Sequence, residues 1–246
     1  MKRLLLLAAI LLVAHSGIFA QFGTVWQRTT ANGNMPTWFG ADLERGVAYG
    51  NVGGKERVYV VSRLSTTTGN MRILDALTGE DVKKTDGVTD STLNITGISG
   101  GTYFLNDVEV SADGKIFTTN LTTNASTSAF KVYMWANENA APVNVVNFTD
   151  AALVNGRFGD RITVTGSVSD NSFVLYAASS LGNVLKVTTA DNGVTFNTEV
   201  ITIGGTYTPP FTQPVATPIP GSTDFYFNAS NRAVIRYTSA GAPIDT

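Results

Sequence analysis

Short apolar or alternating runs recur along the chain, and each has the length of a β-strand. Thr, Val, Ile and aromatic residues favour a pleated, half-buried surface, whereas runs of Ala, Leu, Glu and Lys at helical spacing are missing. Turn sequences such as Asp113-Gly114 separate the runs. The clearest runs cover residues 58–61, 108–110, 115–117, 130–133, 162–164 and 184–187. The pattern predicts an all-β protein whose strands are too short to bury a face alone.

An apolar residue followed by an aromatic residue recurs in four of the predicted strands. The aromatic positions are 59, 117, 176 and 226, so the spacing is 50 to 59 residues. A second strand follows each pair, and a further strand precedes the second and third pairs. Strand, turn, strand, loop, strand, turn and strand over about 50 to 60 residues is the order of a propeller blade. A β-sandwich or an irregular β-solenoid also has short strands, but gives no reason for this spacing.

We therefore predict a β-propeller-like array of about four antiparallel blades. Four units nearly exhaust the 246 residues. A closed four-bladed ring and part of a larger, truncated ring are both compatible with this length. The sequence favours the second, because the chain ends directly after the fourth unit.

The N-terminal residues have the pattern of an export signal. Lys2 and Arg3 precede an apolar run over residues 4–13, and small residues follow as far as Ala20. A transmembrane helix needs about 20 apolar residues, so this run is too short. We predict a signal peptide over residues 1–20 and a propeller-like domain over residues 21–246. The protein would be secreted or held at the cell surface, with no integral membrane segment after cleavage.

The composition of the mature chain narrows the possible chemistry. Cleavage would remove His15, the only histidine, and the chain has no cysteine. A Ser-His-Asp triad, a Cys nucleophile and a Cys/His zinc site are then excluded. Loss of Lys2 and Arg3 would change the net charge from -2 to -4, and no basic cluster suggests nucleic acid as a partner.

Two functions remain open on this basis. The preferred one is a non-catalytic binding or scaffold propeller, without a resident cofactor, that engages a glycan or protein ligand at the mouth of its channel. The alternative is a hydrolase or lyase that uses carboxylates, with or without a bound cation.

Polar residues that open the innermost strands are the first candidates for ligand binding, because these strands line a propeller's channel. Asp107 and Asp160 open equivalent strands, Asn106 precedes Asp107, and Asp42 holds the same place in the first unit. Converging carboxylates could bind calcium or sugar hydroxyls, or act as an acid/base pair. A plainer explanation is that each Asp caps a strand or turn by accepting backbone N–H bonds.

Arg63, Arg161 and Asn120 complete the candidate ligand-binding set. A guanidinium group can form two parallel bonds to a carboxylate, so both arginines would either pair with an Asp between blades or bind an anion. Asn120 follows Phe117 in the same unit. It would either tie a blade edge or face the channel mouth. Trp135 is expected in the core between blades.

Three segments resemble a family of secreted bacterial proteins of unknown function, common in Bacteroidetes-type bacteria. They read RVYVVSR at residues 57–63, ISGGTYFLNDV at 98–108 and GDRITVTG at 159–166. The resemblance covers about residues 24 to 205. It implies a propeller-like fold in an exported or cell-surface protein, and it implies no particular activity.

Overall fold

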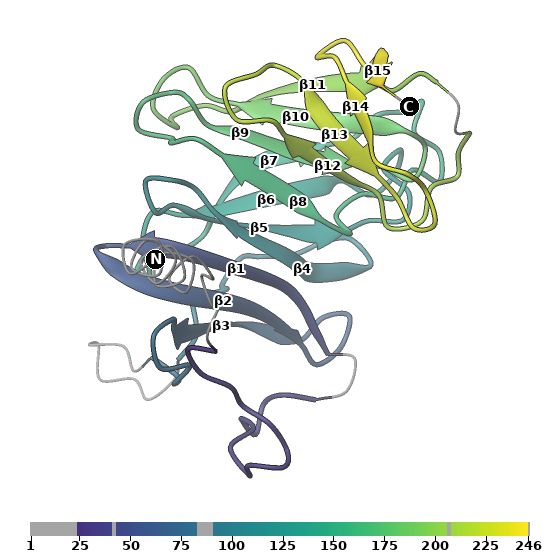
Figure 1. Ribbon diagram of the computed structural model, residues 1–246. Coiled ribbons are helices and arrows are strands. Elements are labelled where there is room, and N and C mark those ends of the chain that lie inside the picture. The colour runs from purple at the N-terminus through teal and green to yellow at the C-terminus, as the bar shows by residue number, and fades with distance from the viewer. Residues whose placement is uncertain (1–23, 41–42, 83–90, 206–207, 246) are drawn as a thin grey trace, which may run out of the picture.

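The computed structural model describes residues 24–40, 43–82, 91–205 and 208–245, which hold 15 strands and no helix. The strands form four antiparallel sheets, in which neighbours along the chain are neighbours in the sheet (Figure 1). Blade 1 consists of β1 (Glu44–Val52), β2 (Lys55–Arg63) and β3 (Gly69–Asp75). Blade 2 consists of β4 (Tyr103–Val110), β5 (Ile116–Leu121), β6 (Phe130–Trp135) and β7 (Val143–Phe148). Blade 3 consists of β8 (Ile162–Thr165), β9 (Val174–Ala178), β10 (Asn183–Thr188) and β11 (Asn197–Thr202). Blade 4 consists of β12 (Val215–Pro218), β13 (Phe225–Asn228), β14 (Ile235–Tyr237) and β15 (Pro243–Asp245).

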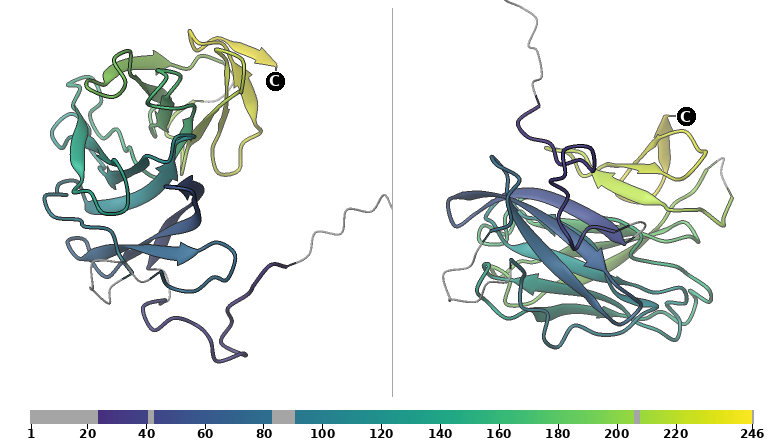
Figure 2. Two further views of the ribbon diagram at one scale, coloured as in Figure 1. Left: turned by 90° about the vertical axis from the view of Figure 1, so that its left-hand side faces the viewer. Right: turned by 90° about the horizontal axis from the view of Figure 1, so that it is seen from below.

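The predicted all-β array of four antiparallel blades is confirmed. Figure 2 shows the four sheets following one another around an arc, and the first strands β1, β4, β8 and β12 adjoin in that order. The repeated apolar-aromatic pair lies on the second strand of every blade, namely β2, β5, β9 and β13. The predicted signal peptide, residues 1–20, and Asp42 lie outside the described residues. No helix in the described part of the chain is long and apolar enough to cross a membrane.

The hydrophobic core lies between the blades rather than within them. One cluster joins blades 1 and 2 around Tyr59, Leu105 and Trp135. A second joins blades 2 and 3, and a third joins blades 3 and 4 around Tyr176 and Phe225. Trp135 is fully buried, as expected, and its indole N–H donates to the Asn94 carbonyl at 2.7 Å. Each blade face is therefore stabilised mainly by removing apolar surface from water against the next blade.

The fourth repeat differs from the others in burial. Tyr59, Phe117 and Tyr176 are almost completely buried, whereas Tyr226 is 44% exposed. Neighbouring residues of a strand point to opposite faces, and Phe225 and Phe227 point into the core shared with blade 3. Tyr226 therefore lies on the face of blade 4 that is turned away from blade 3.

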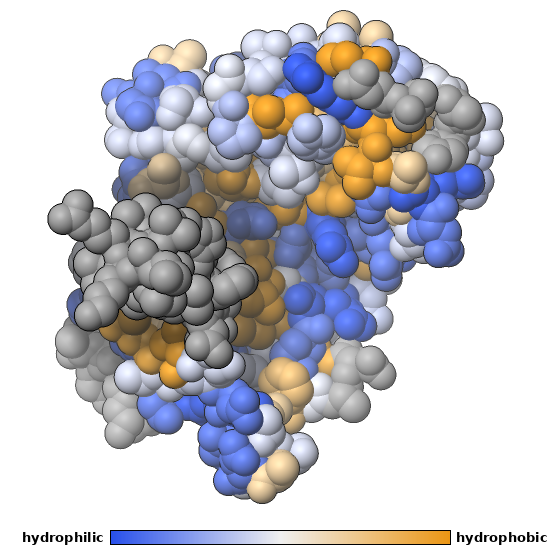
Figure 3. Space-filling model, viewed as in Figure 1, coloured by the Kyte–Doolittle hydropathy of each residue, from blue (hydrophilic) through white to orange (hydrophobic). Residues whose placement is uncertain are grey.

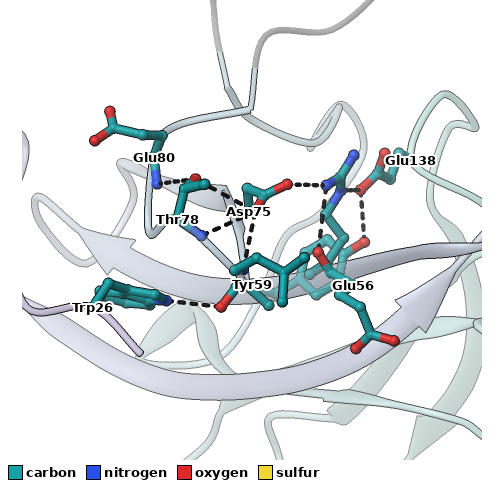
Figure 4. A network of polar contacts seen from close by, with 10 residues as sticks. Trp26, Glu56, Tyr59, Asp75, Thr78, Glu80 and Glu138 are labelled. Carbon is teal, nitrogen blue, oxygen red and sulfur yellow. Dashed lines mark hydrogen bonds and ion pairs between the residues drawn. The ribbon is translucent and has the colours of Figure 1, made fainter. Parts of the chain in front are cut away.

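A polar network also ties blade 1 to blade 2 (Figure 4). Arg57 on β2 donates from Nε to Glu138 at 2.9 Å, and its Nη1 lies 3.3 Å from a carboxylate oxygen of Asp75. The Tyr59 hydroxyl donates to the same Glu138 oxygen at 2.9 Å. Burial and the Glu138 carboxylate raise the pKa of Tyr59 far above its ordinary value, so the phenol stays a donor.

Candidate binding site

A polar cavity of about 820 Å³ lies where the first strands of the four blades meet. Because every blade repeats the same strand order, the residues that open these strands recur around it. In Figure 3 the surface is hollowed between blade 1 and the blades above it, and both hydrophobic and hydrophilic residues are visible in and beside the hollow. The polar lining residues are Glu44, Arg45, Arg63, Thr102, Tyr103, Asn106, Asp107, Glu109, Arg157, Asp160, Arg161, Thr163 and Gln213.

Five of the six residues selected from the sequence line this cavity, and Asn120 does not. Asn120 is fully buried on β5. Its amide donates to the Ala129 carbonyl at 2.9 Å, and its Oδ1 accepts from the Lys131 backbone N–H at 2.9 Å. The sequence left two roles open for Asn120, at a blade edge or at the channel mouth. The structure shows the first, because its side chain connects β5 to β6 by hydrogen bonds.

Asn106 connects three blades at the wall of the cavity. Its Oδ1 accepts a hydrogen bond from Arg63 Nη1 of blade 1 at 2.7 Å. Its Nδ2 donates to the Gly159 carbonyl, just before blade 3, at 2.5 Å. The Arg63 guanidinium also lies over the Tyr103 ring, 3.7 Å from its centroid. Both polar ends of the Asn106 amide are therefore engaged within the protein.

The prediction that Asp107 opens its strand is wrong, because β4 begins at Tyr103 and Asp107 lies within it. Its carboxylate caps the neighbouring blade, as the plainer explanation expects. Its Oδ2 accepts from the backbone N–H of Ile162, at the start of β8, at 2.6 Å. Asp107 is only 9% exposed. Burial raises its pKa to about 6, although the backbone N–H groups of Ile162 and Val108 and the charge of Arg161 act in the opposite direction.

Asp160 pairs with an arginine that the sequence analysis did not select. Its two oxygens accept from Arg157, Oδ2 from Nε at 2.6 Å and Oδ1 from Nη2 at 2.5 Å. Neither Arg63 nor Arg161 forms an ion pair with a described residue. Within the described ranges no group of three or more acidic or histidine side chains is placed to hold a metal ion. The calcium hypothesis has no support from that part of the chain.

Glu109 is a cavity residue that the sequence analysis missed. It lies two positions after Asp107, so both side chains share one face of β4. No described residue forms a hydrogen bond with its carboxyl group. Burial, and to a smaller extent the charge of Asp107, raise the pKa of Glu109 to about 8. The alternation Asp107-Val108-Glu109 was the signal that could have found it.

The folded protein is expected to lose stability as the pH rises from 6 to 8, and replacing Glu109 with Gln is expected to reduce this loss. The pKa of Glu109 in the folded protein, about 8, exceeds its ordinary value of 4.5, so between these values the folded protein holds a proton that the unfolded chain has lost. Stability therefore falls as the pH rises through this interval. We expect E109Q to remove on the order of 1–2 kcal/mol of that fall, less than a fully buried group would give. Urea unfolding at both pH values measures it.

Glu199→Gln is the matched control, because the Glu199 side chain is 60% exposed. It removes a carboxylate outside the cavity, so the comparison separates the effect of Glu109 from the loss of any one carboxylate. An E109Q protein with the same stability difference between pH 6 and 8 as the unmodified protein would show that Glu109 titrates normally.

The chain resembles several solved structures, and no curated protein matches it. A DUF4623 family protein from Bacteroides eggerthii DSM 20697 is 18% identical over 86% of this chain, with a TM-score of 0.61. The chain covers 46% of that protein, a little under half its length. The Aleuria aurantia lectin, solved with Fucα1-6GlcNAc, is 11% identical over 82% of this chain and 60% of its own, with a TM-score of 0.48. The Trypanosoma rangeli sialidase is 13% identical over 80% of this chain and 36% of its own, with a TM-score of 0.45.

The sequence model of one protein family matches residues 12–238, which is most of the chain. That family is described as a domain of unknown function, DUF4623. The predicted resemblance to a bacterial family of unknown function is thereby confirmed. The chain belongs to the DUF4623 family.

Proposed function

We propose that the protein is a non-catalytic binding propeller that holds a glycan in the polar cavity between its first strands. The observation that carries the proposal is the lining of this cavity, about 820 Å³ in volume, which consists mainly of polar and charged side chains. Pockets for most small molecules are lined mainly by apolar and aromatic side chains. A hydroxyl-rich ligand instead needs many hydrogen-bond donors and acceptors, and exposed Thr102, Arg161 and Gln213 supply them.

A glycan suits this lining better than a protein ligand does. The centre of a protein interface is depleted of charged residues and enriched in aromatic ones. The cavity has the opposite composition, since its polar lining contains eight Asp, Glu and Arg side chains and one aromatic side chain, Tyr103. Its wall is also held by cross-blade hydrogen bonds such as that of Asn106 to Gly159, which favours a preformed site.

A carboxylate-dependent hydrolase or lyase is the second candidate, and Glu109 is the observation that favours it. With a pKa of about 8, this side chain would be a protonated acid at neutral pH. The usual two-carboxylate mechanism needs a second free carboxylate. Asp160 pairs with Arg157 through both of its oxygens, and Asp107 accepts from the Ile162 N–H through Oδ2, so each already has a partner within the protein. Turnover of a bound glycan that disappears in E109Q would favour this candidate over simple binding.

Replacing Thr102 with Trp is expected to weaken glycan binding at least tenfold, because the indole would occupy the cavity mouth. Thr102 is exposed and lines the cavity, so the fold should tolerate the change. Thr123→Trp is the matched control, since Thr123 is exposed beside it, with the two hydroxyl oxygens 3.2 Å apart, but outside the lining. A glycan array identifies the ligand, and calorimetry measures its affinity for the three proteins. A silent array, or equal affinities for both variants, would contradict the proposal.

Export is part of the same proposal. It is supported by the positive residues, apolar run and small residues over positions 1–20. The binding experiments therefore use the full chain expressed with its own N-terminus, and mass spectrometry of the exported product reports cleavage. We expect a product that begins at Gln21. Recovery of the intact chain inside the cell alone would contradict export.

A further inference from the structure

Four arginines from two blades line the same cavity. Arg45 on β1 and Arg63 on β2 belong to blade 1, while Arg157 and Arg161 lie just before β8 of blade 3. The charge of Arg157 is neutralised by Asp160. The other three form no ion pair with any residue that the structure describes. The cavity therefore contains three guanidinium groups with no carboxylate of the described residues at ion-pair distance.

Arg63 is the most unusual of these residues, because it is charged and only 6% exposed. Charged side chains are almost never this buried unless they are paired. Its hydrogen-bond partner is the neutral Asn106 amide oxygen, and it lies on the Tyr103 ring. Burial and the nearby positive charges of Arg45 and Arg157 lower the pKa of Arg63, while the carboxylate of Asp160 acts in the opposite direction. Arg63 thus lies among the guanidinium groups of the cavity.

The acidic residues of the cavity do not balance this charge. Glu109 is mostly protonated at neutral pH, since its pKa is about 8. The remaining carboxylates, those of Glu44, Asp107 and Asp160, are three against four guanidinium groups, and only Asp160 forms an ion pair with one of them. A guanidinium group presents several N–H donors in a fixed plane that fits carboxylate, sulfate or phosphate oxygens. Arg63 uses one of these donors on Asn106, which leaves others for a ligand.

We propose that Arg45 and Arg63 form an oxyanion subsite, so that the bound glycan is an acidic one. This inference rests on the proposed glycan binding and specifies its ligand class. Arg63 forms the buried floor of the subsite and is held in place by its contacts with Asn106 and Tyr103. Arg45 is exposed at the start of β1 and makes only one weak bond within the protein, from Nη1 to the Glu44 carbonyl at 3.4 Å. It is free to close over the oxyanion once the ligand is bound.

The experiment compares matched ligands that differ only at their acidic groups. An oligosaccharide of uronic acids is measured against its methyl ester, and a sulfated oligosaccharide against its desulfated form, by calorimetry with the exported protein. We expect at least one acidic ligand to bind ten or more times more tightly than its neutral partner. Raising the salt concentration should reduce this preference, because charge attraction is screened. The two pairs distinguish a carboxylate from a sulfate.

Arg45→Ala tests the assignment without disturbing the interblade tie of Arg63. It is expected to reduce the acidic preference to less than threefold, and Arg45→Lys should restore part of it. Lys55→Ala, an exposed charge at the opposite end of β2 from Arg63, removes the same charge outside the cavity and should keep the full preference. Neutral and acidic ligands that bind equally well would overturn the subsite while leaving glycan binding intact. Persistence of the preference in R45A would also overturn it, whereas the absence of any glycan binding would refute the proposed function itself.

Discussion

Replacing Glu138 with Ala is expected to lower the free energy of unfolding by about 3 kcal/mol, the cost of breaking a buried ion pair. The substitution leaves the Arg57 guanidinium, whose side chain is 6% exposed, with the more distant Asp75 as its remaining carboxylate. It also removes the acceptor of the buried Tyr59 hydroxyl. For a protein of this size the melting temperature should fall by roughly 6–12 °C. Urea and thermal unfolding monitored by circular dichroism measure both quantities.

Glu199→Ala is the matched control for this experiment. Glu199 also forms an ion pair between strands, with Lys186 at 3.2 Å, but its side chain is 60% exposed. Such a pair is expected to contribute at most about 0.5–1 kcal/mol. The loss of stability in E138Q should lie between the losses in E138A and E199A. The amide oxygen of Gln still accepts a hydrogen bond from the Tyr59 hydroxyl, but the charge that pairs with Arg57 is lost. Equal, small effects of E138A and E199A would show that the network of Figure 4 does not hold blades 1 and 2 together.

The blade architecture could be predicted from the sequence because the repeat is local. An apolar-aromatic pair at nearly constant spacing marks the second strand of each blade, and short alternating runs mark its neighbours. The burial of the aromatic residue could not be predicted in the same way. Tyr226 occupies the repeat position of Tyr176, yet it is exposed, because burial depends on whether another blade packs against that face.

The location of the candidate site was also predictable, but its contacts were not. Residues of the inner strands, and those just before them, must lie around the channel in any propeller, so Asp107 within β4 and Asp160 just before β8 line the cavity. Their partners depend on how neighbouring blades are offset. A register shift between Tyr103 and Asp107 interrupts the pairing of β4 with β5, so simple alternation does not give the direction of Asn106. The ties of Asn106 to Arg63 and Gly159 therefore became visible only in the structure.

Gly46→Ala is expected to destabilise the protein by about 3 kcal/mol, at the upper end of the usual cost of overpacking. Gly46 on β1 lies directly against β4. An added Cβ would lie 2.5 Å from the Val108 backbone nitrogen and 2.6 Å from the Asp107 Cα, and it would overlap the Asp107 carboxylate. These are mostly backbone atoms of a strand that is paired with β5, so they cannot rotate away as a flexible side chain would. Urea unfolding measures the loss.

Gly204→Ala provides the comparison that isolates this contact. Its Cβ would meet nothing closer than the Gly241 carbonyl oxygen at 3.7 Å, so it should be neutral or slightly stabilising. Both variants reduce the entropy of the unfolded chain to a similar extent. The difference between their free energies of unfolding therefore measures the cost of the close approach of β1 to β4. Since this approach also sets the width of the cavity beside Asp107, G46A should weaken glycan binding as well as stability. A G46A protein as stable as G204A would mean that blades 1 and 2 are not packed at this distance, and that the cavity beside Asp107 is wider than described.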